Sequence, residues 1–317
     1  MKTFKTLSII AVALVITFFS CKKEEEITVP YNCIANMIAD QTAQNTINNT
    51  GINLSQPGTI NGVNGVEITY STNSFMLNGL LVSGNIDVEI FDANDNKDML
   101  LMDFPTVTDA GGLLTSGGIL EFNPTQNGQT LTINPSFPIQ VSFPASSGAP
   151  MQLWSGTRTS DGVLTWNGTP LPTTVTVDTA WNGNTPTYSY TFPITDATVV
   201  YNCDDLVNTG TPSDVLVTLP EGMNGSNSTV YCYFRDINSV VTFYDNDNDR
   251  TFEWSSSLPA GQVVQFVAVS QIEGIRKWNV SDTISLIAGT HPHIVTEMDV
   301  ALCADALRLS IKDALVD

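Results

Sequence analysis

The sequence has few basic residues and almost no histidine. Its 317 residues carry 12 Lys and Arg against 32 Asp and Glu, with 2 His, for a formal net charge of −20. A surface this acidic repels phosphate backbones and anionic lipid headgroups. We therefore expect no nucleic-acid partner.

The usual signatures of catalytic and metal centres are also missing. The sequence contains no Cys-x-x-Cys pair, no zinc-type Cys/His spacing and no Gly-x-Ser-x-Gly. His291 and His293 flank a proline, with Glu297 as the sole nearby carboxylate, so a solvated loop is favoured over a metal site. These absences predict a protein that is not an enzyme and holds no cofactor, with calcium as the one open alternative.

The N-terminus carries a targeting segment. An apolar run from Leu7 to Phe19 follows two lysines, and its thirteen residues are too few for a membrane-spanning helix. The run ends at Ser20-Cys21, which resembles a bacterial lipobox. We predict that residues 1–20 are a cleaved lipoprotein signal peptide and that Cys21 carries the lipid.

Residues 21–30 form the predicted tether. The run Lys22 to Glu26 reads as a solvated spacer on composition alone. It also resembles the export signal that sends Bacteroidetes lipoproteins to the outer face of the outer membrane. We expect a lipid-anchored outer-membrane protein that faces the cell exterior, with the membrane as a partner through that anchor.

Four cysteines remain after Cys21, in a compartment that permits disulfides. They allow three pairings, of which Cys203 with Cys303 is favoured because it would close a long loop. Alternation places Cys232 on the strand face of Val230 and Phe234, where a reduced core thiol is as consistent as a disulfide.

Alternation with a period of two dominates from Gly51 to Ile287. Ile86 to Ile90 and Ile139 to Phe143 alternate apolar and polar residues, which is typical of half-buried antiparallel strands. Further predicted strands lie at Val66–Tyr70, Ile119–Phe122, Leu131–Ile133, Val175–Val177, Thr187–Phe192, Val215–Leu219, Val240–Tyr244 and Gln262–Ser270. So many short strands predict an all-β fold of two β-sandwich-like domains.

Two helices are expected beside the sheets. One covers Ile34 to Gln44. The other follows a capping box at Thr296 and Asp299 and should lie on a sheet. Its apolar stripe consists of Val300, Cys303, Leu307, Ile311 and Ala314.

A short sequence repeat suggests where the chain divides into domains. Val29-Pro-Tyr-Asn-Cys33 is followed much later by Val199-Val-Tyr-Asn-Cys203, although five residues also match by chance. A boundary there predicts an N-terminal β-sandwich domain at 31–202 and a C-terminal β-rich domain at 203–317, each of ordinary domain size.

Seven stretches carry a further pattern. They are Gly84–Phe91, Lys97–Leu100, Gly112–Gly118, Thr125–Gly128, Met151–Trp154, Tyr190–Ile194 and Asn202–Asp204, with a looser match at Leu219–Met223 and Ser239-Val240. Together these stretches resemble a family of Bacteroidetes cell-surface lipoproteins. The resemblance implies a ZU5-like or immunoglobulin-like β-sandwich followed by a second β-rich domain. It implies no reaction and no functional residues. Val200-Tyr201 stands where the family pattern has Gly-Trp.

One acidic loop could bind calcium. Asp245, Asp247 and Asp249 offer carboxylates at alternate positions, which suits this cation. However, Arg250 and Ser256 occupy the places where an EF-hand has Gly and Glu. A polar hairpin turn is the alternative, because Asp and Asn bond to their own backbone in turns.

Two other acidic patterns are weaker. The run from Asp92 to Asp98 places Asp103 at the twelfth loop position, but Lys97 occupies the glycine position. Asp87 and Glu89 share one strand face and could act as an acid and base pair. The solvent face of an amphipathic strand predicts the same two letters.

Exposed tryptophans would favour a sugar ligand. Trp166-Asn-Gly and Trp181-Asn-Gly place two indole rings beside polar turns, although core packing is the alternative. We expect a non-catalytic surface adhesion, binding or assembly module, with polysaccharide or surface proteins as partners. The competing hypotheses are a carbohydrate-binding lipoprotein that uses Trp166 and Trp181 and, third, a glycoside- or peptide-hydrolysing enzyme.

Overall fold

The computed structural model describes residues 33–145, 147–158, 164–208, 210–254, 256, 258–301 and 304–315. Contacts divide the chain into residues 1–31 and a compact unit from Asn32 to Asp317. The predicted signal peptide, the tether with Cys21, and Cys303 lie outside the described residues. No helix in the described part of the chain combines the length and apolarity needed to cross a bilayer.

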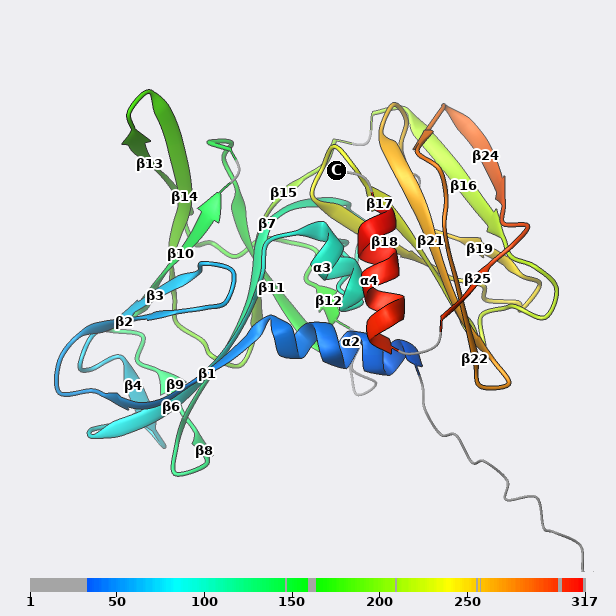
Figure 1. The fold of residues 1–317 in the computed structure, drawn as a ribbon. Coiled ribbons are helices and arrows are strands. Elements are labelled where there is room, and N and C mark those ends of the chain that lie inside the picture. The colour runs from blue at the N-terminus through cyan, green and yellow to red at the C-terminus, as the bar shows by residue number, and fades with distance from the viewer. Residues whose placement is uncertain are drawn as a thin grey trace, which may run out of the picture. The chain divides into compact units, whose positions relative to one another are not determined.

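The first sandwich contains a seven-stranded antiparallel sheet (Figure 1). Its order is β1-β6-β7-β15-β11-β12, with β8 beside β7. The strands are β1 (Thr46–Asn53), β6 (Asn85–Ala93), β7 (Leu114–Gln126), β8 (Gln129–Thr130), β11 (Gln152–Arg158), β12 (Leu164–Trp166) and β15 (Val200–Leu206).

Two smaller sheets complete the first sandwich. A five-stranded sheet has the order β13-β14-β10-β3-β2, and a three-stranded sheet has the order β5-β4-β9. Their strands are β2 (Gly58–Asn61), β3 (Glu67–Tyr70), β4 (Phe75–Leu77), β5 (Leu80–Leu81), β9 (Thr132–Ile133), β10 (Ile139–Ala145), β13 (Thr176–Asn182) and β14 (Thr185–Ile194).

The second sandwich pairs a four-stranded sheet with a six-stranded sheet. The first has the order β19-β16-β20, with β24 parallel to β16, and the second has the order β18-β17-β21-β22-β25, with β23 beside β21. The strands are β16 (Pro212–Thr218), β17 (Ser228–Phe234), β18 (Ser239–Phe243), β19 (Thr251–Glu253), β20 (Leu258–Pro259), β21 (Val263–Ile272), β22 (Ile275–Val280), β23 (Ile284–Ser285), β24 (Gly289–Ile294) and β25 (Asp299–Ala301).

Each sandwich encloses its own apolar core, which confirms the predicted all-β fold. In the first, inward residues of β6 and β7 meet those of β3, β10 and β14. In the second, Val230, Cys232 and Phe234 of β17 meet residues of β16 and β19, as alternation along that strand predicted. Burying this apolar surface is the main stabilising term for both sandwiches.

Three helices and a third core join the sandwiches. The helices are α2 (Cys33–Gln44), α3 (Asn96–Leu101) and α4 (Ala304–Ala314), and they lie between the two sandwiches in Figure 1. Tyr231 and Tyr233 of β17 pack here with Leu114 and Ile119 of β7 and with Leu307 of α4. Strands β7 and β17 are therefore buried on both faces, where the sequence predicted half-buried strands.

The C-terminal helix begins later than predicted. Asp299–Ala301 forms strand β25 against β22, and α4 starts at Ala304, so the capping box at Thr296 and Asp299 is wrong. Strand pairing provides hydrogen-bond partners for backbone N–H groups that the first turn of a helix would leave without them. Leu307 and Ile311 are fully buried, as their place in the predicted stripe required.

The predicted domain boundary falls inside a strand. Residues 202 and 203 both lie in β15, which continues to Leu206 in the sheet of the first sandwich. The second sandwich starts with β16 at Pro212. Within the described residues, the two sandwiches therefore meet between Leu206 and Pro212, and they share the third core.

Candidate functional site

A cleft opens where the two sandwiches meet. Its volume is about 510 Å³, and both sandwiches contribute to its lining. The first contributes the β6–α3 connection, Ser116 and Gly117 of β7, and the end of β10. The second contributes Tyr233 and the β17–β18 turn from Arg235 to Asn238. Ligand sites favour such concave surfaces at domain interfaces.

Amide side chains fix the two walls against each other. Asn238 donates from Nδ2 to the carbonyls of Ser116 (2.7 Å) and Asn94 (3.0 Å). Asn96 donates from Nδ2 to the carbonyl of Phe234 (2.8 Å), and the backbone N–H of Ser116 donates to the carbonyl of Asn238 (2.8 Å). Because these bonds run between the sandwiches, the cleft is formed before any ligand binds.

A buried polar network lies beneath the β7 side of the cleft. The Ser116 hydroxyl donates to Asn202 Oδ1 at 2.8 Å, and Asn202 donates to Asp204. Gly117 and Gly118 form a β-bulge, since the β7–β15 register shifts opposite them. Burial raises the pKa of Asp204 well above its ordinary value, so its neutral form is favoured.

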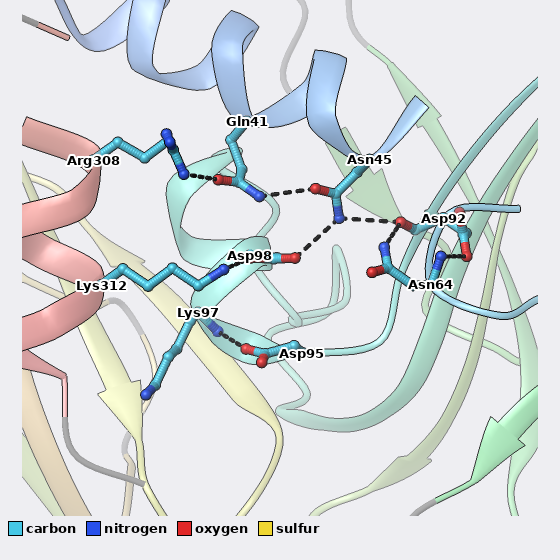
Figure 2. A network of polar contacts seen from close by, with 9 residues as sticks. All are labelled: Gln41, Asn45, Asn64, Asp92, Asp95, Lys97, Asp98, Arg308 and Lys312. Atoms are coloured by element: carbon cyan, nitrogen blue, oxygen red, sulfur yellow. Dashed lines mark hydrogen bonds and ion pairs between the residues drawn. The ribbon is translucent and has the colours of Figure 1, made fainter. Parts of the chain in front are cut away.

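Helix α3, which begins at the cleft, is held by the polar network in Figure 2. Arg308 donates to Gln41 (3.2 Å), Gln41 to Asn45 (2.8 Å) and Asn45 to Asp98 (3.1 Å). Lys312 forms an ion pair of 2.7 Å with Asp98. The network therefore ties α2, α3 and α4 together behind the cleft.

The N-cap of α3 forms part of the cleft wall. Asp95 accepts the backbone N–H of Lys97 at 2.6 Å, as an N-cap side chain does. Nearby, the Asp92 carboxylate accepts the backbone N–H groups of Val63 and Asn64, each at 2.8 Å. Figure 2 shows the bond from Asn64. Desolvation raises the pKa of Asp92, while these bonds act against that rise.

The predicted calcium residues do lie together. Ligand oxygens of Asp245, Asp247 and Asp249 are all within 4.8 Å of one another. Asp245 already accepts backbone N–H groups of Gly225 (3.0 Å), Asp249 (3.1 Å) and Arg250 (3.1 Å). The loop is thus organised by its own backbone bonds, and calcium binding remains a prediction.

Asp87 and Glu89 lie on the exposed face of β6, as the strand alternation predicted. Asp87 accepts the backbone N–H of Gly51 at 2.9 Å, and Glu89 accepts from Asn123 at 3.3 Å. Both line a pocket of about 210 Å³ with polar side chains of β1 and β7. Nothing in this arrangement assigns either carboxylate a role in acid or base chemistry.

The two candidate glycan-stacking tryptophans differ in exposure. Trp166 is fully buried and donates from Nε1 to the carbonyl of Pro105 at 2.8 Å, so its predicted stacking role is wrong. Trp181 is 68% exposed on β13. Of the other three, all in the described residues, Trp154 is buried and Trp254 and Trp278 are half-buried.

The histidines and Cys203 also depart from expectation. His291 and His293 lie on strand β24, where the sequence predicted a solvated loop. The His293 ring lies 5.0 Å from that of Phe266, and burial lowers its pKa. Cys203 is a free, fully buried thiol in the first core, contrary to the predicted disulfide with Cys303. Cys303 itself lies outside the described residues.

Sequence reasoning missed the residues that build the cleft. Asn96 and Asn238 look like ordinary loop residues, and no pattern links positions so far apart. The sequence pattern showed Asp103 only as the last position of an incomplete calcium loop. In the structure Asp103 lines a pocket beside β17 and β18, apart from the cleft. An observable signal was the Gly117-Gly118 pair, which marks the bulge at the cleft.

Comparisons with known proteins do not show a family. No protein-family model and no curated protein matches the sequence. A solved structure of Gamma-CGTASE from alkalophilic Bacillus clarkii is similar at 11% identity, with a TM-score of 0.21. The match covers 82% of this chain and 43% of that chain, so this chain spans less than half of that protein. A likeness this weak supports no statement about function.

Proposed function

We propose that the protein is a lipid-anchored, non-catalytic binding or assembly module of the outer cell surface, and that it holds its partner in the cleft between the sandwiches. The observation that carries this proposal is the bracing of that cleft by Asn96 and Asn238. A wall fixed in advance lowers the entropy lost on binding.

The chemistry of the lining supports binding rather than turnover. Among the described residues, burial raises the pKa of the carboxyl groups of Asp92, Asp103 and Asp204, and none of these three lines the cleft. The described lining instead offers amides, backbone groups, one arginine and two exposed carboxylates. Such groups position a polar partner by hydrogen bonds and charge.

The anchor half of the proposal rests on the sequence around Cys21. Its test is metabolic labelling of cells with a radioactive fatty acid, comparing the natural chain with Cys21→Ser. We expect the natural chain, but not Cys21→Ser, to carry the label, and we expect external protease to cleave the natural chain on intact cells. Label on both proteins, or complete protection from external protease, would contradict the proposal.

The cleft is tested by photo-crosslinking on living cells. A benzoyl-phenylalanine is placed at Asp236, which is exposed in the cleft, or at the matched exposed control Glu221. We expect a discrete adduct from position 236 alone. Equal adducts from both positions, or none from either, would exclude the cleft as the binding site.

Trp181 supports a second candidate, a carbohydrate-binding lipoprotein. Its exposed ring could stack on a sugar. Tryptophan fluorescence and gel retardation with algal, plant and bacterial polysaccharides test this. Saturable binding that Trp181→Ala abolishes favours this candidate, whereas turnover that depends on Asp87 or Glu89 would favour the hydrolase.

A further inference from the structure

The second sandwich carries a pocket of its own, apart from the cleft. Its volume is about 350 Å³. Asp103 and Pro105 line it from the segment after α3, and Ser228 and Thr229 line it from β17. The end of β18 and the turn after it contribute Thr242, Tyr244, Asp245 and Asn246. It shares no lining residue with the cleft, so the two sites can be tested separately.

Asp103 occupies an unfavourable position in this pocket. It follows the C-cap of α3 with φ of 55°, where glycine or asparagine is favoured. Its half-buried carboxyl interacts with the Tyr231 hydroxyl and accepts from Thr242 Oγ1 at 3.4 Å. Backbone strain and carboxylate desolvation thus meet at one residue, a combination typical of functional sites.

The rest of the wall provides an aromatic ring and a second carboxylate. Tyr244 is 46% exposed, although it lines the pocket, so part of its ring is open to a ligand. Asp245 is held in place by its three backbone donors. Asp247 and Asp249 lie beside it, and none of the described lining residues is basic.

We propose that this pocket binds the guanidinium or ammonium group of a basic side chain, with arginine preferred. A guanidinium can stack on Tyr244 while it donates to Asp103. The surrounding acidic residues and the net charge of −20 would attract a cation towards the pocket. A neutral sugar could stack on Tyr244 and donate hydroxyl hydrogen bonds to the carboxylates, but it would gain no charge attraction from them.

The test uses the chain from Lys22 to Asp317, which omits Cys21 and contains the whole compact unit. Calorimetry compares acetyl-Gly-Arg-Gly-amide with the same peptide carrying citrulline, a neutral arginine analogue. We expect saturable binding of the arginine peptide, at least ten-fold weaker binding of the citrulline peptide, and further weakening in high salt.

Three variants locate the binding. Asp103→Asn keeps a side chain that tolerates the left-handed backbone, and Tyr244→Leu removes the aromatic face. Each substitution should weaken binding of the arginine peptide at least five-fold, while circular dichroism shows that the variant is still folded. The exposed control Glu221→Gln should bind as the natural chain does.

Other outcomes overturn the proposal. Equal affinity for both peptides would assign the pocket to neutral polar groups. Binding of calcium chloride alone, with no binding of the arginine peptide, would make it a cation site built on Asp245. Absence of all binding, or arginine binding that Asp103→Asn and Tyr244→Leu leave unchanged, would remove the pocket as a site for basic side chains.

Discussion

At the residue scale, Asp103 shows how one position can work against stability. Burial raises its pKa in the folded state, with the Tyr231 and Thr242 hydroxyls acting in the opposite direction. The stability that comes from its neutral form is present below the unfolded pKa of about 3.9 and is lost as pH rises through the folded pKa. The ionised carboxylate therefore weakens the folded state at neutral pH.

Asp103→Asn should consequently stabilise the protein. At pH 7 we expect the free energy of unfolding to rise by about 1 kcal/mol, and the gain to shrink towards pH 3. Urea unfolding of both proteins across this range measures the difference. Tyr231 and Tyr244 face the side chain at position 103 in both proteins, and Asp245 lines the same pocket. A variant less stable than the natural chain at pH 7 would refute this account.

Asp245, unlike Asp103, should stabilise the folded state. Asp245→Ala removes the acceptor of three backbone N–H groups, so the free energy of unfolding should fall by about 1–3 kcal/mol. The loss should be the same in calcium and in a chelator, because the loop is already satisfied by its backbone. A melting temperature that calcium raises in the natural chain alone would instead establish the predicted metal site.

The two tryptophans provide a matched pair. Trp166→Ala should cost about 3–5 kcal/mol, because it empties a buried site and leaves the Pro105 carbonyl without its donor. Trp181→Ala should change stability by less than about 0.5 kcal/mol, because the ring is exposed. Chemical denaturation measures both free energies of unfolding. Similar losses in the two variants would contradict the burial of Trp166 and the exposure of Trp181.

At the scale of elements, the β17–β18 turn positions one wall of the cleft. Asn238→Ala leaves the Ser116 and Asn94 carbonyls without their donor, which should cost about 1–3 kcal/mol. Hydrogen exchange should become faster at Ser116, whose N–H bonds to the Asn238 carbonyl. The control Asn182→Ala, on exposed β13, should change neither quantity. Unchanged exchange at Ser116 would mean that Asn238 does not hold the wall.

At the scale of the whole molecule, the third core makes the sandwiches depend on each other. Tyr231 and Val267 of the second sandwich share that core with Ile119 of the first and Leu307 of α4. We expect one cooperative thermal transition for residues 32–317, and we expect Leu307→Ala to lower it as a whole. Calorimetry with two resolved transitions would show that the sandwiches unfold independently.

The sequence alone determined the local structure of this protein. Alternation in Ile86 to Ile90 and Ile139 to Phe143 predicted strands, because a half-buried strand needs a period of two. The same argument placed Cys232 on the strand face of Val230 and Phe234, which the second core buries, and it placed Asp87 and Glu89 on a solvent face. The Asp245 loop was also located, since turn-forming residues act through their own backbone.

Only the tertiary structure decided what covers each face and which distant residues meet. Alternation cannot reveal that Trp166 is buried, because the side chains that pack over Trp166 come from elements remote in sequence. Strand pairing with β22 overrode the helix signal at Asp299. The cleft depends on Asn96 and Asn238, whose amides bond across the sandwiches. Such contacts follow from packing, which leaves no period in the sequence.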